Sequence, residues 1–222
     1  MPFTLSHAVV AIPFGRTRVP AGAVAVGAMV PDAPLFFSGG AGYGLLHDPR
    51  GALLVGLPLA LVVYAAWRVL VRPILRGVLP QRIGERLPET WTEKPSAAWT
   101  GLWRTPGTTS AGTVALLLVA LLIGLATHLL WDGFTHDGRW GTDLLPILRR
   151  EIGGVALATW AHYVSSALGL VVLACYGVVA LRRRPARPVQ ERAGLPVAVA
   201  FWAASGAGVL LGVVVGLRIL IS

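Results

Sequence analysis

Three ionisable residues spaced four apart, His128, Asp132 and His136, stand at the end of an apolar segment that begins near residue 110. On an α-helix, residues i and i+4 project from the same face. Neutral imidazole and carboxylate groups are ligands of zinc and similar divalent ions. The spacing therefore predicts a helix that presents metal ligands at one end, and the His128/Asp132 pair is its most specific part. A simple hydrogen-bonded His–Asp pair is the alternative interpretation.

Three further residues can supply ligands of the same kind. His7 lies near the start of the first apolar arm of residues 3–30, and Asp32 lies in a Pro-Asp-Ala-Pro turn that ends the second arm. Each arm is too short to cross a hydrocarbon core of about 30 Å, so we expect a helical hairpin that brings both ends to one side. His47 lies in the glycine-rich loop 36–51. The alternatives are an interfacial role for His7, an Asx-turn at Asp32 and a solvated surface at His47.

Candidates for proton transfer are fewer. A spare carboxylate, Asp48 or Asp137, is a candidate general base beside the expected metal site. His162 lies about two turns into an apolar segment, and we expect it to assist catalysis by orienting a ligand. The alternatives for His162 are direct ligation or a hydrogen bond to Ser165 or Ser166. No serine lies in a nucleophile-elbow context, and no phosphate loop or dinucleotide-binding fingerprint is present in the sequence.

The composition places these residues in a membrane protein. The 222 residues are 55% hydrophobic and 13% charged, with a mean hydropathy of +0.69. About a quarter of the residues in soluble domains are charged, so the charged fraction of this chain is about half of the typical value. The net charge of +9 is compatible with nucleic-acid binding, but the arginines lie in loops between apolar segments, so we exclude that class. The single cysteine allows no intrachain disulfide.

The order of apolar and polar segments predicts one all-α, polytopic membrane domain covering residues 1–222, with the hairpin in residues 1–34. Four full spans are expected, at residues 52–71, 113–131, 155–181 and 195–217. They are separated by a polar connector at residues 72–110, a loop at residues 132–154 and a basic loop at residues 182–194.

The positive charges predict an orientation. Seven of the 19 Lys and Arg residues lie in residues 68–104 and five in residues 182–192, two segments on the same side of an alternating bundle. Basic loops remain in the cytoplasm, so the connector and the basic loop are expected there. The His and Asp residues then face the outside of the plasma (inner) membrane.

Four segments also resemble a known group of proteins: MPFTLSHAVVAIP, VGAMVPDAPLF, THLLWDGFTHDG and HYVSSALGL. They resemble an uncharacterised bacterial family of small integral-membrane proteins, which is similar to membrane-bound metal-dependent hydrolases and, more distantly, to zinc-dependent phospholipase C. The match covers most of residues 1–170. The resemblance implies a metal site formed by residues at these positions: His7, Asp32, His47, His128, Asp132 and, next to them, His136.

We therefore expect a membrane-embedded metal-dependent hydrolase that binds a divalent ion, most simply zinc, and acts on a lipid-linked ester or phosphate. A bound zinc ion lowers the pKa of its water toward about 7 and polarises the scissile group. A Mg²⁺-dependent prenyl or lipid diphosphate transferase or cyclase is one alternative, although magnesium prefers oxygen ligands. A non-enzymatic scaffold or transporter component with a structural metal site is the other. The expected partners are membrane lipids and a lipid-like substrate, with no nucleic acid.

Overall fold

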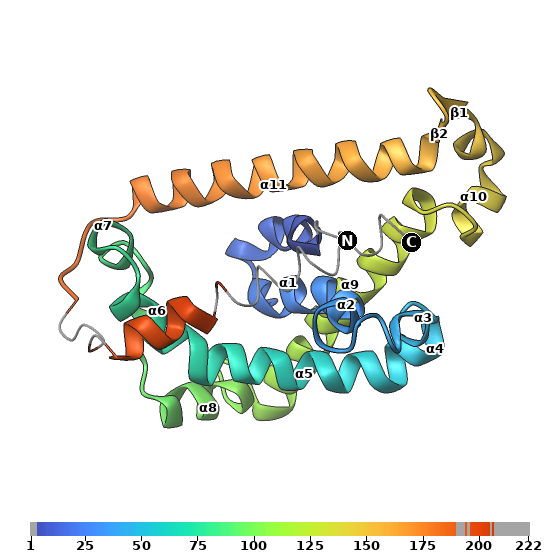
Figure 1. Cartoon of the computed structure of the whole chain (residues 1–222). Coiled ribbons are helices and arrows are strands. Elements are labelled where there is room, and N and C mark those ends of the chain that lie inside the picture. Colours follow the sequence, from blue (N-terminus) through green and yellow to red (C-terminus); the bar gives the residue numbers. More distant parts are fainter. Residues whose placement is uncertain (1–3, 190–193, 195, 205, 207–222) are drawn as a thin grey trace.

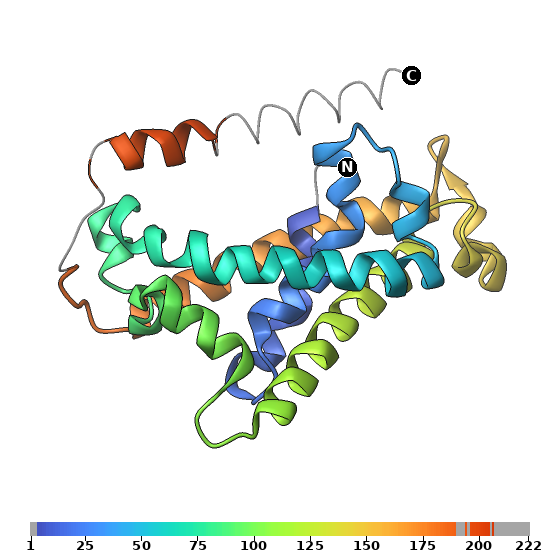
Figure 2. The same cartoon turned by 90° about the horizontal axis from the view of Figure 1, so that it is seen from below.

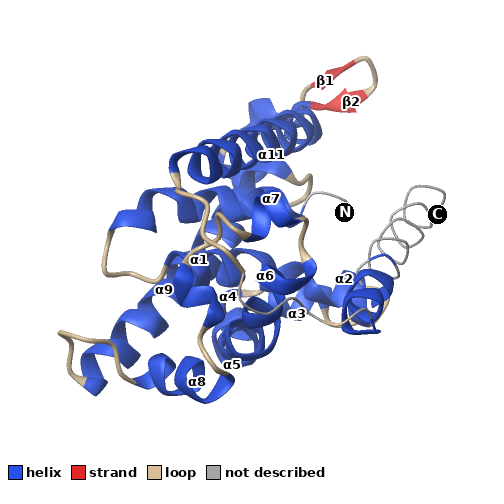
Figure 3. Cartoon of the chain, turned by 90° about the vertical axis from the view of Figure 1, so that its left-hand side faces the viewer, coloured by secondary structure: helices blue, strands red, loops and turns tan. Residues whose placement is uncertain are grey.

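The computed structural model of the protein describes residues 4–189, 194, 196–204 and 206, which are almost entirely helical (Figures 1 and 3). The helical elements in chain order are η1 (Thr4–Arg16), α1 (Ala21–Met29), η2 (Val30–Asp32), α2 (Ala33–Phe37), α3 (Tyr43–Leu46), α4 (Pro49–Gly51), η3 (Ala52–Gly56), α5 (Leu57–Ala66), η4 (Trp67–Val71), α6 (Arg72–Val78), α7 (Gln81–Gly84), η5 (Glu89–Thr92), α8 (Pro95–Trp103), α9 (Ser110–Thr135), α10 (Trp140–Leu144), η6 (Pro146–Arg149) and α11 (Leu157–Arg183). Residues 196–204 are also helical.

Among the described residues, three helices are long and apolar enough to cross a membrane: the continuous rod Pro49–Val78 from α4 to α6, α9 and α11. They match the spans expected at residues 52–71, 113–131 and 155–181; the first two are longer than expected, and the third has the expected length but is shifted by two residues. Figure 2 shows α9 crossing the α4–α6 rod obliquely. The chain is therefore compatible with a multi-pass membrane protein. The fourth span, expected at residues 195–217, lies largely outside the described residues.

The first two helices pack against each other and against α9. A short turn at residues 17–20 joins η1 to α1, and α1 crosses α9 through two glycines. A Cβ atom on Gly27 would lie 2.3 Å from the carbonyl oxygen of Leu121, and one on Gly124 would lie 2.3 Å from that of Val24. Small residues let helix backbones approach this closely. The crossing positions the end of α1 beside the ligand-bearing half of α9.

Helix α9 runs from Ser110 to Thr135, with a capping hydrogen bond at its start and an extended residue after its end. The side chain of its N-cap, Thr109, accepts a hydrogen bond from the Gly112 N–H at 3.1 Å, which satisfies one free donor of the first turn. His136 at the other end is extended, and Gly138 follows with φ +70°. The helix therefore includes Asp132, whereas the sequence predicted that a loop began at that residue.

The prediction of a loop at residues 132–154 is also wrong beyond the end of α9, because the segment contains regular elements. It contains α10, η6 and the first strand of a small antiparallel hairpin, in which β1 (Glu151–Ile152) pairs with β2 (Val155–Ala156). Gly153 and Gly154 form the turn with φ +64° and +76°, the conformation that a two-residue hairpin loop of this type requires. The fold is thus nearly, but not entirely, all-α (Figure 3).

The connector expected at residues 72–110 is also more helical than predicted, because its first seven residues continue the α4–α6 rod. Its later part contacts the chain that follows α11. The buried guanidinium of Arg76 donates to the Gly84 carbonyl at 3.0 Å and to the Arg187 carbonyl at 3.3 Å, and the Arg187 N–H donates to the Glu85 carbonyl at 2.8 Å. The two arginine-rich segments therefore meet at one end of the bundle.

Candidate metal centre

Four buried side chains from distant segments bring their ligand atoms within 4.8 Å of one another: Asp32, His47, His128 and Asp132. Asp32 ends η2, His47 follows α3, and the other two lie one turn apart on α9. Their exposed fractions run from 0% for His128 to 8% for His47. Two imidazoles and two carboxylates thus share one water-poor volume, which we call the His/Asp cluster.

Asp132 connects the two imidazoles of the cluster. Its Oδ2 lies 3.3 Å from His47 Nε2 and 3.4 Å from His128 Nε2. Asp32 Oδ1 lies 3.7 Å from each of the same two nitrogens. Both carboxylates and both Nε2 atoms therefore face a common point.

Hydrogen bonds to backbone carbonyls fix which nitrogen of each ring carries the proton. His128 Nδ1 lies 2.7 Å from the Ala28 carbonyl oxygen, and His47 Nδ1 lies 2.9 Å from the Tyr43 carbonyl oxygen. A carbonyl oxygen can only accept, so each Nδ1 is the donor and each Nε2 of a neutral ring keeps its lone pair. The two Nε2 atoms nevertheless lie 3.1 Å apart. This orientation, with Nδ1 held by the protein and Nε2 free, is typical of metal-binding histidine.

Asp32 is held by a residue that the sequence did not single out as part of the site. The Thr4 hydroxyl donates to Asp32 Oδ2 at 2.7 Å, and Thr4 is itself buried. This contact uses the oxygen of Asp32 that faces away from the two histidines, so Oδ1 remains available. This role of Thr4 could not be predicted from the sequence, since nothing local indicates a partner 28 residues away.

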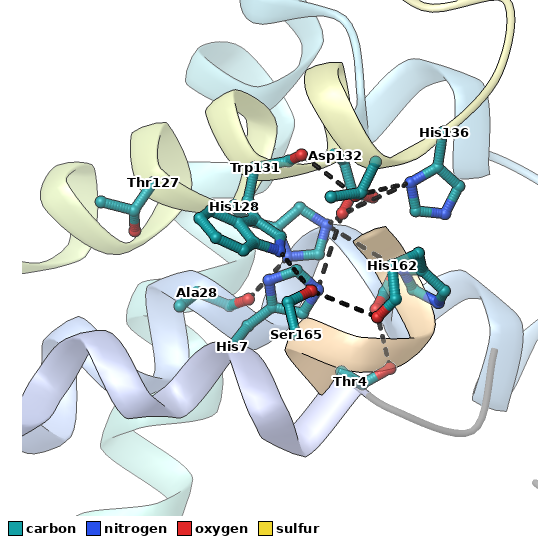
Figure 4. Close-up of polar contacts among 12 residues, drawn as sticks. Thr4, His7, Ala28, Thr127, His128, Trp131, Asp132, His136, His162 and Ser165 are labelled. Carbon is teal, nitrogen blue, oxygen red and sulfur yellow. Dashed lines mark hydrogen bonds and ion pairs between the residues drawn. The ribbon is translucent and has the colours of Figure 1, made fainter. Parts of the chain in front are cut away.

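Two more histidines lie beside the second oxygen of Asp132. His7 Nε2 lies 3.6 Å from Asp132 Oδ1 and His136 Nδ1 lies 3.7 Å from it (Figure 4). Among the described residues, this buried oxygen has no hydrogen-bond partner. Burial, aided by the nearby His128, lowers the pKa of His7 to about 4, and burial also lowers the pKa of His136. Both rings are therefore neutral at pH 7, the form that binds metals.

The three residues expected to act in catalysis occupy different positions. Asp48 is exposed, and its Oδ1 accepts hydrogen bonds from the N–H groups of Arg50 at 2.9 Å and Gly51 at 3.1 Å, so it caps the first span. Asp137 is exposed beyond the end of α9. His162 is buried on α11, with its ring centroid 4.7 Å from that of His136. Of these three, the structure brings only His162 to the edge of the cluster.

An aromatic stack supports His47 from outside the cluster. The Tyr43 ring lies on the His47 ring with centroids 3.8 Å apart, and the Arg139 guanidinium carbon lies 5.8 Å from the centroid of Tyr43. Burial raises the pKa of Tyr43, so its hydroxyl stays protonated. Neither Tyr43 nor Arg139 was identified from the sequence, because contact between them depends on how α3 meets the loop after α9.

A cavity of about 270 Å³ adjoins His47. Its wall is largely apolar and includes one cation, Arg139. The lining residues are His47, Pro49, Ala126, Leu129, Leu130, Gly133, Arg139 and Trp140. A ligand in this cavity would contact the Arg139 side chain, an apolar face of α9 and one histidine of the cluster.

The residues of the cluster fit a divalent metal ion. Two neutral imidazole nitrogens and two carboxylate groups form a donor set that zinc and related ions accept, and the unpartnered Asp132 Oδ1 leaves a further donor. The carbonyl contacts of both imidazoles supply the outer hydrogen bonds that such sites usually have. His7 and His136 stand next to this set, outside the group of four.

A comparison with protein-family models matches residues 1–220 to one family, described as a domain of unknown function, DUF4184. Neither the curated proteins nor the solved structures include a match to this chain.

Proposed function

The chain belongs to the DUF4184 family, whose function is unknown, and we propose that it is a membrane-embedded metal-dependent hydrolase acting on a lipid-linked ester or phosphate. The observation that carries the proposal is the approach of His47 Nε2 and His128 Nε2 to 3.1 Å with both Nδ1 atoms already bonded to carbonyls. Two lone pairs and two carboxylates facing one point in a buried volume repel one another unless a proton or a metal cation lies between them, and a divalent ion can bind all four groups at once.

Zinc is the metal that we propose for this site. Its preferred ligands are nitrogen and sulfur with some carboxylate oxygen, whereas Mg²⁺ prefers oxygen ligands and retained water. The two imidazoles therefore count against the magnesium-dependent transferase or cyclase. When bound, zinc would supply an acidified water and an electrophile for the scissile carbonyl or phosphoryl oxygen. Asp32, His47, His128 and Asp132 would hold the ion.

The chain's own residues supply binding and proton transfer. The cavity beside His47 combines an apolar wall with Arg139, which suits a lipid chain attached to a phosphate or an ester. His136 is neutral at pH 7 and lies 3.7 Å from Asp132, so we assign it the role of proton acceptor. His162, whose ring lies against that of His136, would orient it. Asp48 and Asp137 remain further candidates for the base, although both are exposed.

A structural metal site is a second candidate function, because all four ligands are buried. Closed sites with four protein ligands and no accessible position are typical of structural zinc. His47 favours the catalytic alternative, since it also lines the neighbouring cavity. The two functions predict the same metal content and differ in turnover.

The test uses the full chain purified in detergent. Elemental analysis should find about one zinc per chain, and bis(p-nitrophenyl) phosphate or p-nitrophenyl palmitate should be hydrolysed. His128→Ala with Asp132→Ala should abolish both the metal and turnover, whereas the matched control Asp137→Ala, on an exposed carboxylate five residues away, should retain the metal. Wild-type protein without stoichiometric metal overturns the proposed site. Stoichiometric metal without turnover of either probe favours the structural role.

A further inference from the structure

A second cavity, of about 370 Å³, lies at the opposite end of α9 from the His/Asp cluster. Thr113, which lines this cavity, lies 19 positions before Asp132; at 1.5 Å per residue, the distance along the helix is about 28 Å. That separation is close to the thickness of a hydrocarbon core, about 30 Å. The two sites therefore belong to opposite ends of the same apolar helix.

The lining of this second cavity is basic and rich in hydroxyl groups. It contains two arginines, four threonines and no Asp or Glu among its described residues. The polar lining residues are Thr17, Arg18, Tyr64, Arg68, Thr105, Thr108 and Thr113. Exposed residues of the turns after η1 and after α8 border the cavity, so it is accessible from outside.

Arg68 lines this cavity and forms no ion pair with any residue that the structure describes. Its Nε is buried and has no hydrogen-bond partner in the part of the chain that the structure describes. Arg72, one turn further along the same helix, likewise has a buried Nε without a hydrogen-bond partner, but its charge has a carboxylate partner, since its Nη2 lies 3.1 Å from Glu93 Oε2. A buried donor of a charged group that lacks a partner is costly, and an anion in the cavity would supply one.

The walls around Arg68 are fixed by other contacts. The Thr113 hydroxyl donates to the Thr109 carbonyl at 3.1 Å and accepts from the Thr105 N–H at 3.1 Å, which ties the turn after α8 to the start of α9. On the other side, a Cβ atom on Gly101 would lie 2.5 Å from Arg68 Nη2. The absence of a side chain at Gly101 is therefore what gives the guanidinium its place against α8.

We propose that this cavity, the arginine pocket, binds a phosphate group through Arg68 and Arg18 at the end of the bundle opposite the His/Asp cluster. A guanidinium matches phosphate oxygens with two parallel hydrogen bonds, and threonine hydroxyls can donate further ones. The phosphate is either free or part of a lipid headgroup, because the pocket lies one hydrocarbon thickness from the cluster. This inference does not depend on the proposed hydrolase activity.

The experiment measures binding to the full chain purified in a maltoside detergent. Native mass spectrometry compares phosphatidic acid with phosphatidylcholine, and calorimetry titrates inorganic phosphate. Arg68→Gln should weaken binding of the phosphate-bearing probe by at least about tenfold, the loss expected for a charge-assisted pair. The matched control Arg72→Gln, whose wild-type charge is already paired with Glu93, should stay within about twofold of wild type.

The two probes identify the source of the phosphate. Arg68-dependent binding of inorganic phosphate supports a soluble ligand, and Arg68-dependent binding of phosphatidic acid alone supports a lipid headgroup. Binding of neither probe, or equal loss in Arg68→Gln and Arg72→Gln, overturns the proposal. If Arg68→Gln does not fold, Gly101→Ala provides the same comparison, because its methyl group displaces the guanidinium while the charge is kept. Unchanged binding by Gly101→Ala would then count against the pocket.

Discussion

His47 Nε2 and His128 Nε2 lie 3.1 Å apart although the two residues are 81 positions apart in the sequence. Each ring donates its Nδ1–H to a backbone carbonyl, of Tyr43 and of Ala28 respectively, so neither Nε2 can donate to the other while both rings are neutral. Two carboxylates add negative charge at the same point. The folded chain therefore holds an arrangement that a bound cation stabilises and that its removal destabilises.

Metal removal should lower the thermal stability of the protein. An ion that binds only the folded chain stabilises it by about 2.7 kcal/mol when present at 100 times its dissociation constant. Excess EDTA should therefore lower the melting temperature of the wild-type chain in detergent, and added Zn²⁺ should restore it. The melting temperature of His128→Ala should not respond to either reagent. An identical response of wild type and His128→Ala would show that the effect of the chelator arises elsewhere.

Asp48→Ala tests whether the Asp48 carboxylate caps the first span and has no role in metal binding. The Asp48 side chain accepts two backbone N–H groups at the start of the first span, so its loss should lower the free energy of unfolding by about 1 kcal/mol. The zinc content should be unchanged, since Asp48 is not one of the four convergent ligands. Asp48→Ser, which can still cap, should recover most of the stability in a thermal melt. Loss of zinc from Asp48→Ala with a normal melt would show that this carboxylate does serve the metal.

Tyr43 should act on the metal through the orientation of His47. The two rings stack with centroids 3.8 Å apart, and the carbonyl of Tyr43 accepts the Nδ1–H of His47. Tyr43→Ala keeps the carbonyl and removes the stack, so zinc affinity should fall by about tenfold, the lower end of the usual effect of such supporting groups. Tyr43→Phe keeps both and should bind zinc within about twofold of wild type. Competition with a chromogenic chelator measures both constants, and equal losses would assign the effect to the hydroxyl.

The sequence was most informative where a ligand pattern coincides with a regular element. His128 and Asp132 face one point because α9 is an uninterrupted helix through both, which is what their spacing predicted. Asp32 and His47 join them from outside α9, and their residue types were sufficient to nominate them. The supporting groups were not foreseeable, because the Thr4 hydroxyl and the Ala28 carbonyl reach the site only through the packing of η1 and α1.

The ends of elements were less predictable than their existence. Hydropathy falls at Asp132, so the sequence placed a loop there, yet the helix continues to Thr135 because Asp132 is buried among the histidines that surround it. Similarly, the polar residues after Val71 suggested a connector, whereas the helix extends to Val78. In both places, polar side chains that the sequence pattern assigned to solvent make tertiary contacts instead, so the helix continues through them.

The crossing of α1 and α9 should control both stability and metal binding. A methyl group on Gly124 would lie 2.3 Å from the Val24 carbonyl oxygen and 2.5 Å from the Ala28 nitrogen, so Gly124→Ala must push the helices apart. Because His128 Nδ1 is hydrogen-bonded to the Ala28 carbonyl, the displacement should weaken zinc binding, and it should also lower the melting temperature of the chain. Gly177→Ala is the matched control: this helical glycine on α11 has no described atom within 4 Å of an added Cβ. It should melt at or slightly above the wild-type temperature, because alanine favours the helix by about 1 kcal/mol. If Gly124→Ala melts lower but retains full zinc affinity, the crossing stabilises the fold without positioning His128.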